Sequence, residues 1–269
     1  MIVLAAVAFA GSMANAESLK IEGSTTVGPI ADAFAEYFKS NLGISDITVT
    51  KNGSGNGAAA IADGRCDIGI MSRFMKDKEF KACVEKDPAV MPVAHVVAMD
   101  GVCVVVNPAN PVKELTTDQI RDIYTGKITN WKEVGGPDME IVNITRDSAS
   151  GTFETFESLV MNKQKMSKKT EEVATNPQMH SRVSTTRGAI GYVGLGFVDH
   201  KVKALSVNGI TPSRSTIASG TYPVTRPLFM FTNGYPKLGT AVHKFISFHL
   251  SEEGQEIIES KGFVPLTSY

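Results

Sequence analysis

Short apolar segments alternate with longer amphipathic segments along most of this 269-residue sequence. Residues 47–50 are all β-branched, and such side chains pack well on the pleated surface of a strand; residues 67–71 form another predicted strand. In an earlier segment, Ile30, Phe34 and Phe38 recur every four residues and therefore lie on one face of a helix. Strands that alternate with helices in this way predict an α/β protein with largely parallel or mixed sheets.

Two apolar runs, Val93–Val106 and Tyr222–Thr232, are long for single strands of one small sheet. We interpret both runs as segments that cross between two lobes, each of which has a mixed sheet flanked by helices. The boundaries that we expect are residues 17–98 and 225–269 for lobe 1 and residues 99–224 for lobe 2.

The N-terminus has the pattern of an export signal. An apolar run at Ile2–Ala10 is followed by Ala14-Asn15-Ala16, a small-residue cleavage site, so we expect residues 1–16 to be a signal peptide. The run is too short to span a bilayer. No Lys or Arg precedes it, which departs from the usual pattern, and a buried N-terminal strand is the alternative interpretation.

The charge balance limits the kinds of ligand. With 27 Lys and Arg against 28 Asp and Glu, the formal net charge is −1. Nucleic acids and anionic membranes are bound through an excess of basic residues in patches, so the composition argues against both. An anionic ligand of this chain has to be held by a few well-placed groups.

The sequence contains three cysteines, Cys66, Cys83 and Cys103. An exported protein with this odd number has at most one disulfide and one thiol left over. Cys66–Cys83 is one possible pair, but the sequence does not show that the two are close. The absence of a C-x-x-C motif argues against thioredoxin-type and zinc-knuckle sites.

Clusters of glycine and hydroxyl side chains occur three times between a strand and a helix, at Gly23–Thr26, Gly53–Gly57 and Ser148–Thr152. At a helix start the backbone N–H groups are unpaired and the helix dipole is positive, so such turns can bind anions. Helix capping is the ordinary explanation of any one such turn. Three of them favour a shared anion site, because ligands of open α/β sheets collect where strands end.

Arg146 and Ser72 are two further candidates for this site. Arg146 lies just before the third turn and carries a guanidinium fork that suits a tetrahedral oxyanion. The alternative for Arg146 is a surface salt bridge with Asp147 or another neighbour. Ser72 follows the strand at residues 67–71, and its alternative role is to cap the next helix.

Motifs for other chemistry are missing from the sequence. The segment Gly53–Gly57 is not followed by the G-K-[ST] of a P-loop, and it does not fit the dinucleotide pattern G-x-G-x-x-G. The nucleophile elbow G-x-S-x-G is absent. The five histidines are scattered without H-E-x-x-H spacing, so we expect no metal and no cofactor. A Ser/His/Asp triad is not excluded by sequence, but no residue stands out as its nucleophile.

Taken together, these motifs resemble those of the periplasmic phosphate-binding proteins of Pst phosphate ABC transporters. The resemblance extends from Leu19 to Leu266, and it depends on the order and spacing of the motifs because no single one is specific. The motifs are Gly23–Pro29, Asn52–Gly55, Asp67–Arg73, Asp118–Trp131, Arg146–Thr152, Gly188–Val193 and Gly220–Leu228.

The resemblance implies a type II periplasmic binding fold that clamps its ligand between two lobes. It also implies a monomeric phosphate-binding protein of the periplasm, without enzymatic activity, that delivers phosphate to the membrane permease subunits of an ABC importer. The phosphate contacts that it implies are Thr25, Thr26, Ser54, Ser72, Arg146, Ser150, Gly151 and Thr152.

One residue departs from part of the family. Some members have an aspartate where this chain has Ser72, and that carboxylate accepts the proton of hydrogen phosphate. A serine enforces the preference for hydrogen phosphate over fully ionised sulfate less strongly. We consider Asp147 as the residue that distinguishes these two anions instead. Three alternative functions stay open: binding of another oxyanion such as sulfate, molybdate or tungstate, hydrolysis of phosphate esters outside the cell, and a surface protein that has kept only the fold.

Overall fold

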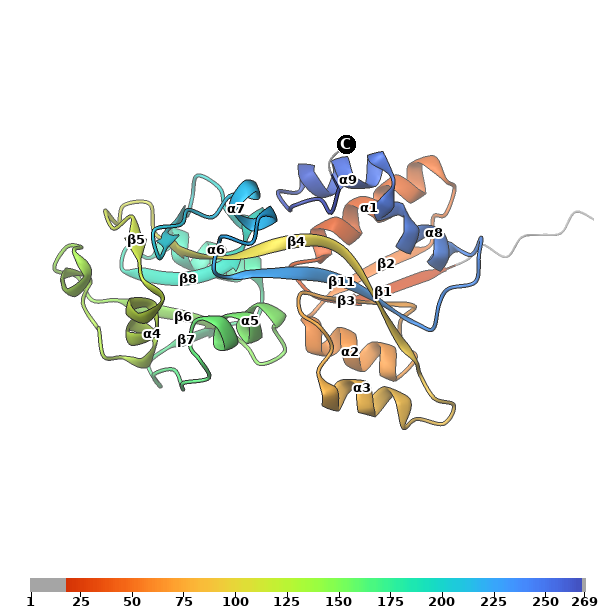
Figure 1. Cartoon of the computed structure of the whole chain (residues 1–269), viewed down its shortest axis with the longest axis horizontal. Helices are drawn as coiled ribbons and strands as arrows, with labels where there is room; N and C mark the ends of the chain where they lie inside the picture. Colours follow the sequence, from red (N-terminus) through yellow and green to blue (C-terminus); the bar gives the residue numbers. More distant parts are fainter. Residues whose placement is uncertain (1–17, 268–269) are drawn as a thin grey trace, which may run out of the picture.

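The computed structural model describes residues 18–267 and has two lobes joined by a pair of long strands (Figure 1). The expected signal peptide at residues 1–16 lies outside the described residues. Within residues 18–267, every helix is too short or too polar to cross a membrane.

The first lobe has three parallel strands covered by helices on both faces. The strand β1 pairs in parallel with β2 on one side and with β3 on the other. Figure 1 shows α1, α8 and α9 on one face and α2 and α3 on the other. The elements are β1 Leu19–Gly23, α1 Gly28–Asn41, β2 Ile47–Lys51, α2 Ser54–Ala62, β3 Ile68–Met71, α3 Asp77–Val84, α8 Ala241–Ser247, the 3₁₀ helix Phe248–Leu250 and α9 Glu252–Ser260.

The second lobe is built around the parallel strands β6, β7 and β8. Helices α4, α5 and α7 contribute to one apolar cluster and α6 to another. The elements are β5 Glu114–Leu115, α4 Thr117–Thr125, the 3₁₀ helix Trp131–Val134, β6 Val142–Arg146, α5 Gly151–Leu159, β7 Glu171–Val173, α6 Asn176–Thr185, β8 Ala189–Gly194, the 3₁₀ helix Leu195–Phe197, β9 Lys203–Ala204, β10 Ser206–Val207 and α7 Arg214–Ala218.

The strands β4 (Pro92–Val106) and β11 (Thr225–Asn233) run antiparallel from one lobe into the other (Figure 1). The first part of β4 pairs with β11, and its last five residues, 102–106, pair with β8. The two expected sheets are therefore halves of one nine-stranded sheet, ordered β2-β1-β3-β11-β4-β8-β6-β7 with β9 beside β4. The prediction of two crossing segments is confirmed, and a separate two-stranded sheet joins β10 to β5.

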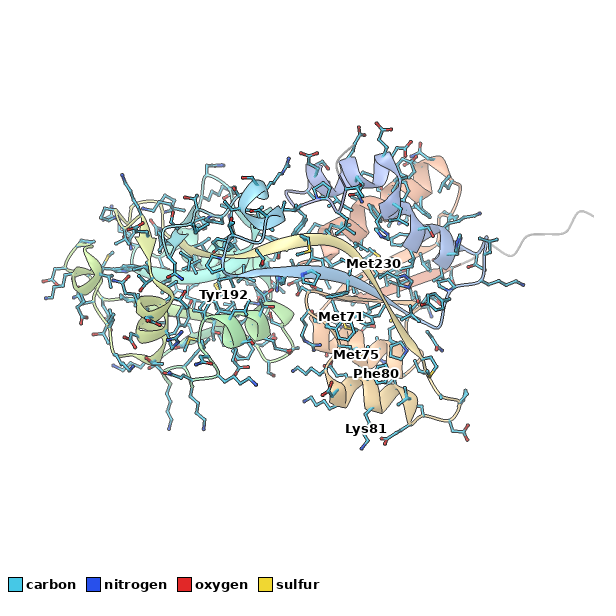
Figure 2. All side chains as sticks on the ribbon, in the orientation of Figure 1. Met71, Met75, Phe80, Lys81, Tyr192 and Met230 are labelled. Atoms are coloured by element: carbon cyan, nitrogen blue, oxygen red, sulfur yellow. The ribbon has the colours of Figure 1, made fainter. Side chains whose placement is uncertain are left out.

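The amphipathic pattern of α1 explains how the first core forms. Ile30, Phe34 and Phe38 are each at most 1% exposed, as their spacing predicts, and both phenylalanines pack against the ring of Phe245 in α8. Figure 2 shows side chains filling both lobes, with Tyr192 in the second lobe and Met230 in the first. Each lobe thus has apolar clusters of its own.

The helix α2 begins at Ser54, four residues earlier than the Ala-rich stretch at residues 58–62 suggests. Its glycines allow this early start because the helix approaches the sheet closely. A Cβ atom on Gly57 would lie 2.8 Å from the carbonyl oxygen of Glu22 and 2.9 Å from that of Ile70. The glycine-rich stretch therefore forms the first turn of a helix instead of a loop.

All three cysteines are free thiols in the structure, so the possible Cys66–Cys83 disulfide is not formed. Cys83 and Cys103 are buried, and burial raises the pKa of both thiols. Burial also raises the pKa of Cys66 to about 12. Thiols with such raised pKa values are poor nucleophiles at neutral pH because the thiolate is scarce.

We expect Phe34→Ala to lower the free energy of unfolding by about 3–5 kcal/mol, because it leaves a cavity among aromatic rings that cannot collapse fully. Tyr235→Ala is the matched control, since Tyr235 is 85% exposed, and it should change this free energy by less than about 0.5 kcal/mol. Urea unfolding followed by circular dichroism measures both. Equal effects of the two substitutions would contradict this description of the core.

Candidate functional site

The turn after β1 presents two buried threonines at the start of α1. The Ser24 hydroxyl accepts the N–H groups of Thr26 and Val27 at 3.1 and 3.3 Å, so Ser24 is the residue that holds the turn. Thr25 and Thr26 are 6% and 1% exposed and keep their hydroxyls available for contacts with the other lobe. Ser24 therefore stabilises the turn, and Thr25 and Thr26 provide the hydroxyls of the candidate site.

Ser54 and Ser72 come together at the ends of two other strands of the same lobe. Ser54 Oγ accepts the backbone N–H of Ser72 at 3.0 Å and lies 3.3 Å from Ser72 Oγ. Both serines are at most 1% exposed. They meet because β2 and β3 both pair with β1 in parallel, so their carboxyl ends lie at one edge of the sheet.

The second lobe contributes the start of α5. Ser150 Oγ accepts the backbone N–H of Phe153 at 3.2 Å and so caps the helix, as the ordinary explanation of such a turn predicts. The hydroxyl proton of Ser150 stays free to be donated to a ligand. Thr152 is 1% exposed, and its Oγ1 lies 3.1 Å from Thr26 Oγ1 of the first lobe.

The two lobes touch each other at these hydroxyls. Gly55 N–H donates to the carbonyl oxygen of Ala149 across the interface at 3.0 Å. A Cβ atom on Gly151 would lie 2.5 Å from Ser54 Oγ and 2.7 Å from Ser72 Oγ, so an alanine there would displace both buried hydroxyls. The structure brings seven of the predicted site residues into contact, and the eighth, Ser150, directly precedes Gly151 in the turn; the seven are Thr25, Thr26, Ser54, Ser72, Arg146, Gly151 and Thr152.

Arg146 is buried at this junction and is 2% exposed. Its Nη2 donates to the carbonyl oxygen of Ala174 at 2.7 Å and to Thr25 Oγ1 at 3.3 Å, whereas Nε and Nη1 have no hydrogen-bond partner within residues 18–267. No described carboxylate forms an ion pair with it, so the surface salt bridge considered from sequence is wrong. Burial lowers the pKa of Arg146 to about 10, which leaves the guanidinium charged at neutral pH.

Asp147, which we considered as the discriminating acceptor, has another role in the structure. Its Oδ1 accepts the backbone N–H of Ala149 at 3.0 Å, and the residue is partly exposed. This bond stabilises the turn that leads into α5. The structure therefore gives Asp147 a local contact and no contact with the hydroxyls of the site.

Asn176 is a residue of the site that we did not predict. Its Nδ2 lies 3.1 Å from Thr25 Oγ1 and 2.9 Å from Thr26 Oγ1, and it is fully buried. The signal was present in the sequence, because Asn176-Pro177 begins a helix soon after the strand β7.

A buried ion pair between Asp100 of β4 and Arg226 of β11 was also missed. Arg226 Nε and Nη2 donate to Asp100 Oδ2 at 3.0 and 2.8 Å, and Nη2 lies 3.3 Å from Thr26 Oγ1. Burial raises the pKa of Asp100, and the Arg226 guanidinium opposes that rise. Opposite charges in two otherwise apolar crossing segments are the sequence signal that could have revealed this pair.

A second set of ion pairs joins the lobes beside the hydroxyls. Glu154 of α5 lies 2.5 Å from Arg73 Nε and 2.8 Å from Lys76 Nζ, both of the first lobe. Arg73 also forms a bidentate pair with Glu79 at 2.7 and 2.8 Å, which fixes its position. Because Arg73 and Glu154 are largely buried, these contacts are screened less than surface pairs and help to hold the lobes together.

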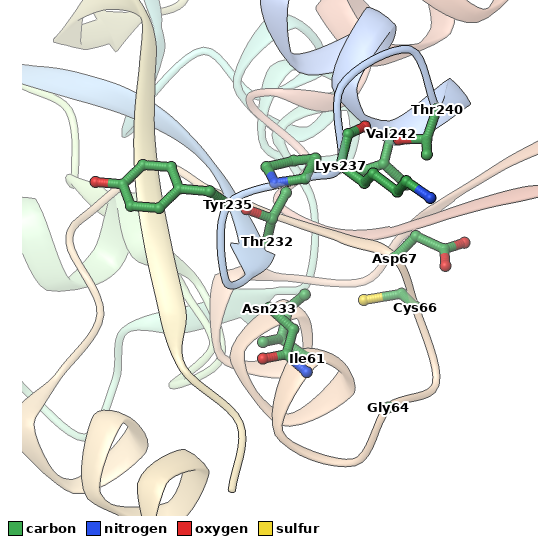
Figure 3. A pocket seen from close by; sticks show the side chains of 11 residues that line it. Ile61, Gly64, Cys66, Asp67, Thr232, Asn233, Tyr235, Lys237, Thr240 and Val242 are labelled. Carbon is green, nitrogen blue, oxygen red and sulfur yellow. Dashed lines mark hydrogen bonds between the residues drawn. The ribbon is translucent and has the colours of Figure 1, made fainter.

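A pocket lies away from this junction, in the first lobe (Figure 3). It has a volume of about 420 Å³ and is lined by residues that include Cys66, Asp67 and Tyr235. Asp67 accepts the backbone N–H of Lys20 at 2.8 Å, and its carboxylate would repel an anion. Within the described chain, no group of three or more His, Cys, Asp or Glu residues could hold a metal ion.

We expect Gly151→Ala to keep the lobes apart while each lobe stays folded, because its Cβ would clash with the two buried serine hydroxyls of the first lobe in their present positions. Gly55→Ala is the matched control at the same interface, since its Cβ would make ordinary contact with Ala149 at 3.5 Å. Small-angle X-ray scattering should show a larger radius of gyration for Gly151→Ala and a wild-type value for Gly55→Ala. A wild-type radius for both would show that this junction tolerates the extra methyl group.

The chain is similar to known proteins over most of its length. Residues 9–253 match the PBP superfamily domain. The phosphate-binding protein PstS of Bacillus subtilis is 34% identical over 255 residues, covering 93% of this chain and 81% of that protein. A phosphate ABC transporter substrate-binding protein from Clostridium perfringens, solved with bound phosphate, is 34% identical with a TM-score of 0.85, covering 93% of this chain and all (100%) of that one. An ABC-type phosphate transport receptor from Vibrio cholerae is 32% identical with a TM-score of 0.74, covering 92% and 99% of the two chains. This chain therefore belongs to the PBP superfamily and, within it, to the PstS family.

Proposed function

We propose that this protein binds inorganic phosphate between its two lobes and delivers it to the membrane permease subunits of an ABC importer. The observation that carries the proposal is the Arg146 guanidinium, buried with two unpartnered nitrogens where hydroxyls of both lobes converge. A phosphate oxyanion supplies the missing negative charge and accepts these N–H groups. The relatives named for phosphate binding and the phosphate-bound structure support the same ligand.

The ligand contacts that we propose are the side chains of Thr25, Thr26, Ser54, Ser72, Arg146, Ser150 and Thr152, together with Gly151. Each hydrogen bond to a charged group contributes about 1.5–3 kcal/mol. Desolvation and lobe closure offset much of the sum. A handful of such bonds is consistent with micromolar or tighter binding, about −8 kcal/mol.

The lobes that close on phosphate are, in this proposal, residues 17–98 with 225–269 and residues 99–224. The hinge lies in the crossing strands β4 and β11, which are the segments that pass from one lobe to the other. The protein acts as a monomer in the periplasm after removal of residues 1–16, and the permease binds its closed form.

The site supports binding and not hydrolysis. Within residues 18–267, the hydroxyls at the junction have arginine, amide, backbone or other hydroxyl partners, and no histidine or carboxylate that could take their protons. An activated nucleophile needs such a base within hydrogen-bond reach. Turnover of a chromogenic phosphate ester, measured with and without divalent metal, tests this part of the proposal. We expect the reaction mixtures to stay colourless.

Another tetrahedral oxyanion is the second candidate ligand, and Ser72 is the observation that favours it. A serine can either donate or accept a hydrogen bond, so it does not reject a fully ionised anion as a carboxylate would. A thermal-shift screen against phosphate, arsenate, sulfate and molybdate tests the choice. Phosphate binding predicts the largest stabilisation with phosphate and arsenate, since ligand binding raises stability by mass action.

We expect Arg146→Met to weaken phosphate binding by about ten- to a hundredfold, the effect of losing charge-assisted hydrogen bonds. The unliganded variant should be at least as stable as the wild type, because a buried charge without a carboxylate partner is removed. Arg182→Met is the matched control, since Arg182 pairs with Glu171 at the surface. Calorimetry and thermal unfolding measure both properties, and wild-type affinity in Arg146→Met would refute the site.

A further inference from the structure

A second buried arginine also has a guanidinium nitrogen without a hydrogen-bond partner among the described residues. Arg226 is 4% exposed, and its Nη1 atom is buried without a hydrogen-bond partner within residues 18–267. The other two nitrogens of its guanidinium bind Asp100, and Nη2 also lies within reach of Thr26 Oγ1 at 3.3 Å. The guanidinium is therefore anchored to Asp100 through Nε and Nη2, Nη2 also approaches a site hydroxyl, and Nη1 remains without a described partner.

The position of Arg226 is fixed by the crossing strands. Arg226 of β11 and Asp100 of β4 are directly opposite each other in the antiparallel register. Asp100 Oδ1 accepts the backbone N–H of Leu195 at 2.9 Å, so both carboxylate oxygens are engaged. A planar guanidinium that is held through two nitrogens has little freedom to turn its third nitrogen elsewhere.

The contacts of Thr26 show why this arginine matters to the site. A threonine hydroxyl has one proton to donate and two lone pairs. Asn176 Nδ2 and Arg226 Nη2 both approach Thr26 Oγ1, at 2.9 and 3.3 Å, and both can only donate. With its lone pairs occupied, Thr26 has to donate its own proton, to Thr152 or to an anion between the lobes.

We propose that Arg226 is a second anion-binding arginine, which donates through Nη1 to the bound phosphate and holds Thr26 as a donor through Nη2. Asp100 neutralises the charge of Arg226, so the pair adds hydrogen-bond donors without adding net charge. Arg146 then remains the uncompensated cation of the site. This inference rests on the proposed phosphate binding and assigns a further residue to it.

The competing explanation is that the Asp100–Arg226 pair only ties β4 to β11. The double variant Arg226→Gln with Asp100→Asn separates the two explanations, because it removes both buried charges together and leaves neither one unpaired. We expect this variant to fold and to bind phosphate at least about tenfold more weakly by calorimetry. A pair that is only structural predicts wild-type affinity, and that result would overturn the proposal.

Arg226→Lys provides a second measurement that keeps the ion pair with Asp100. A lysine has one nitrogen at its tip, so it cannot bind Asp100, Thr26 and phosphate through separate nitrogens in the arginine geometry. We again expect at least about tenfold weaker binding, with thermal stability close to that of the wild type. Wild-type affinity in this variant would also overturn the proposal. The surface pair variant Arg182→Gln with Glu171→Gln is the matched control for removal of an ion pair.

A double-mutant cycle with Thr26→Val distinguishes direct binding from an effect through Thr26. If Arg226 acts only by orienting that hydroxyl, Arg226→Lys has no further effect on phosphate affinity once the hydroxyl is gone. Direct donation from Nη1 predicts a further loss of about fivefold or more in the Thr26→Val background. Failure of phosphate binding itself is recognised separately, because wild-type protein would then show no calorimetric signal with phosphate.

Discussion

Arg146 carries a positive charge into the junction of the two lobes, where no described carboxylate pairs with it. Burying a charge in this way is unfavourable unless other groups compensate for it. The carbonyl oxygen of Ala174 and the hydroxyl of Thr25 solvate one nitrogen, and two nitrogens remain for an anion. The overall net charge of −1 is therefore no obstacle to anion binding, because local groups set the potential.

The crossing strands connect this site to the movement of the lobes. β4 and β11 form the middle of the nine-stranded sheet, and they carry Asp100 and Arg226 to the same junction. In the proposed function, a hinge in strands that also carry anion-binding groups would couple closure to ligand contacts. The ion pairs of Glu154 with Arg73 and Lys76 add a contact that forms only when the lobes meet.

Much of the site could be predicted from local sequence signals. Glycine and hydroxyl residues between a strand and a helix mark places where unpaired N–H groups and strand ends coincide, and this led to Thr25, Ser54 and Ser150. The start of α2 was placed too late because the glycines at 55 and 57 suggested a loop. Gly57 is there because the helix approaches β1 and β3 closely, which is a property of packing.

The sequence by itself determined the α/β alternation, the two crossing segments and the polar turns, because hydrophobic periodicity and turn chemistry are local properties. Only the tertiary structure decided which groups are partners. Arg146 could have met Asp147 at the surface, and it instead lies buried beside Thr25, 121 positions away in sequence. Arg226 and Asp100 become neighbours through the antiparallel register of two strands that are distant in sequence. Pairings of this kind depend on strand order and lobe contact, which no local pattern specifies.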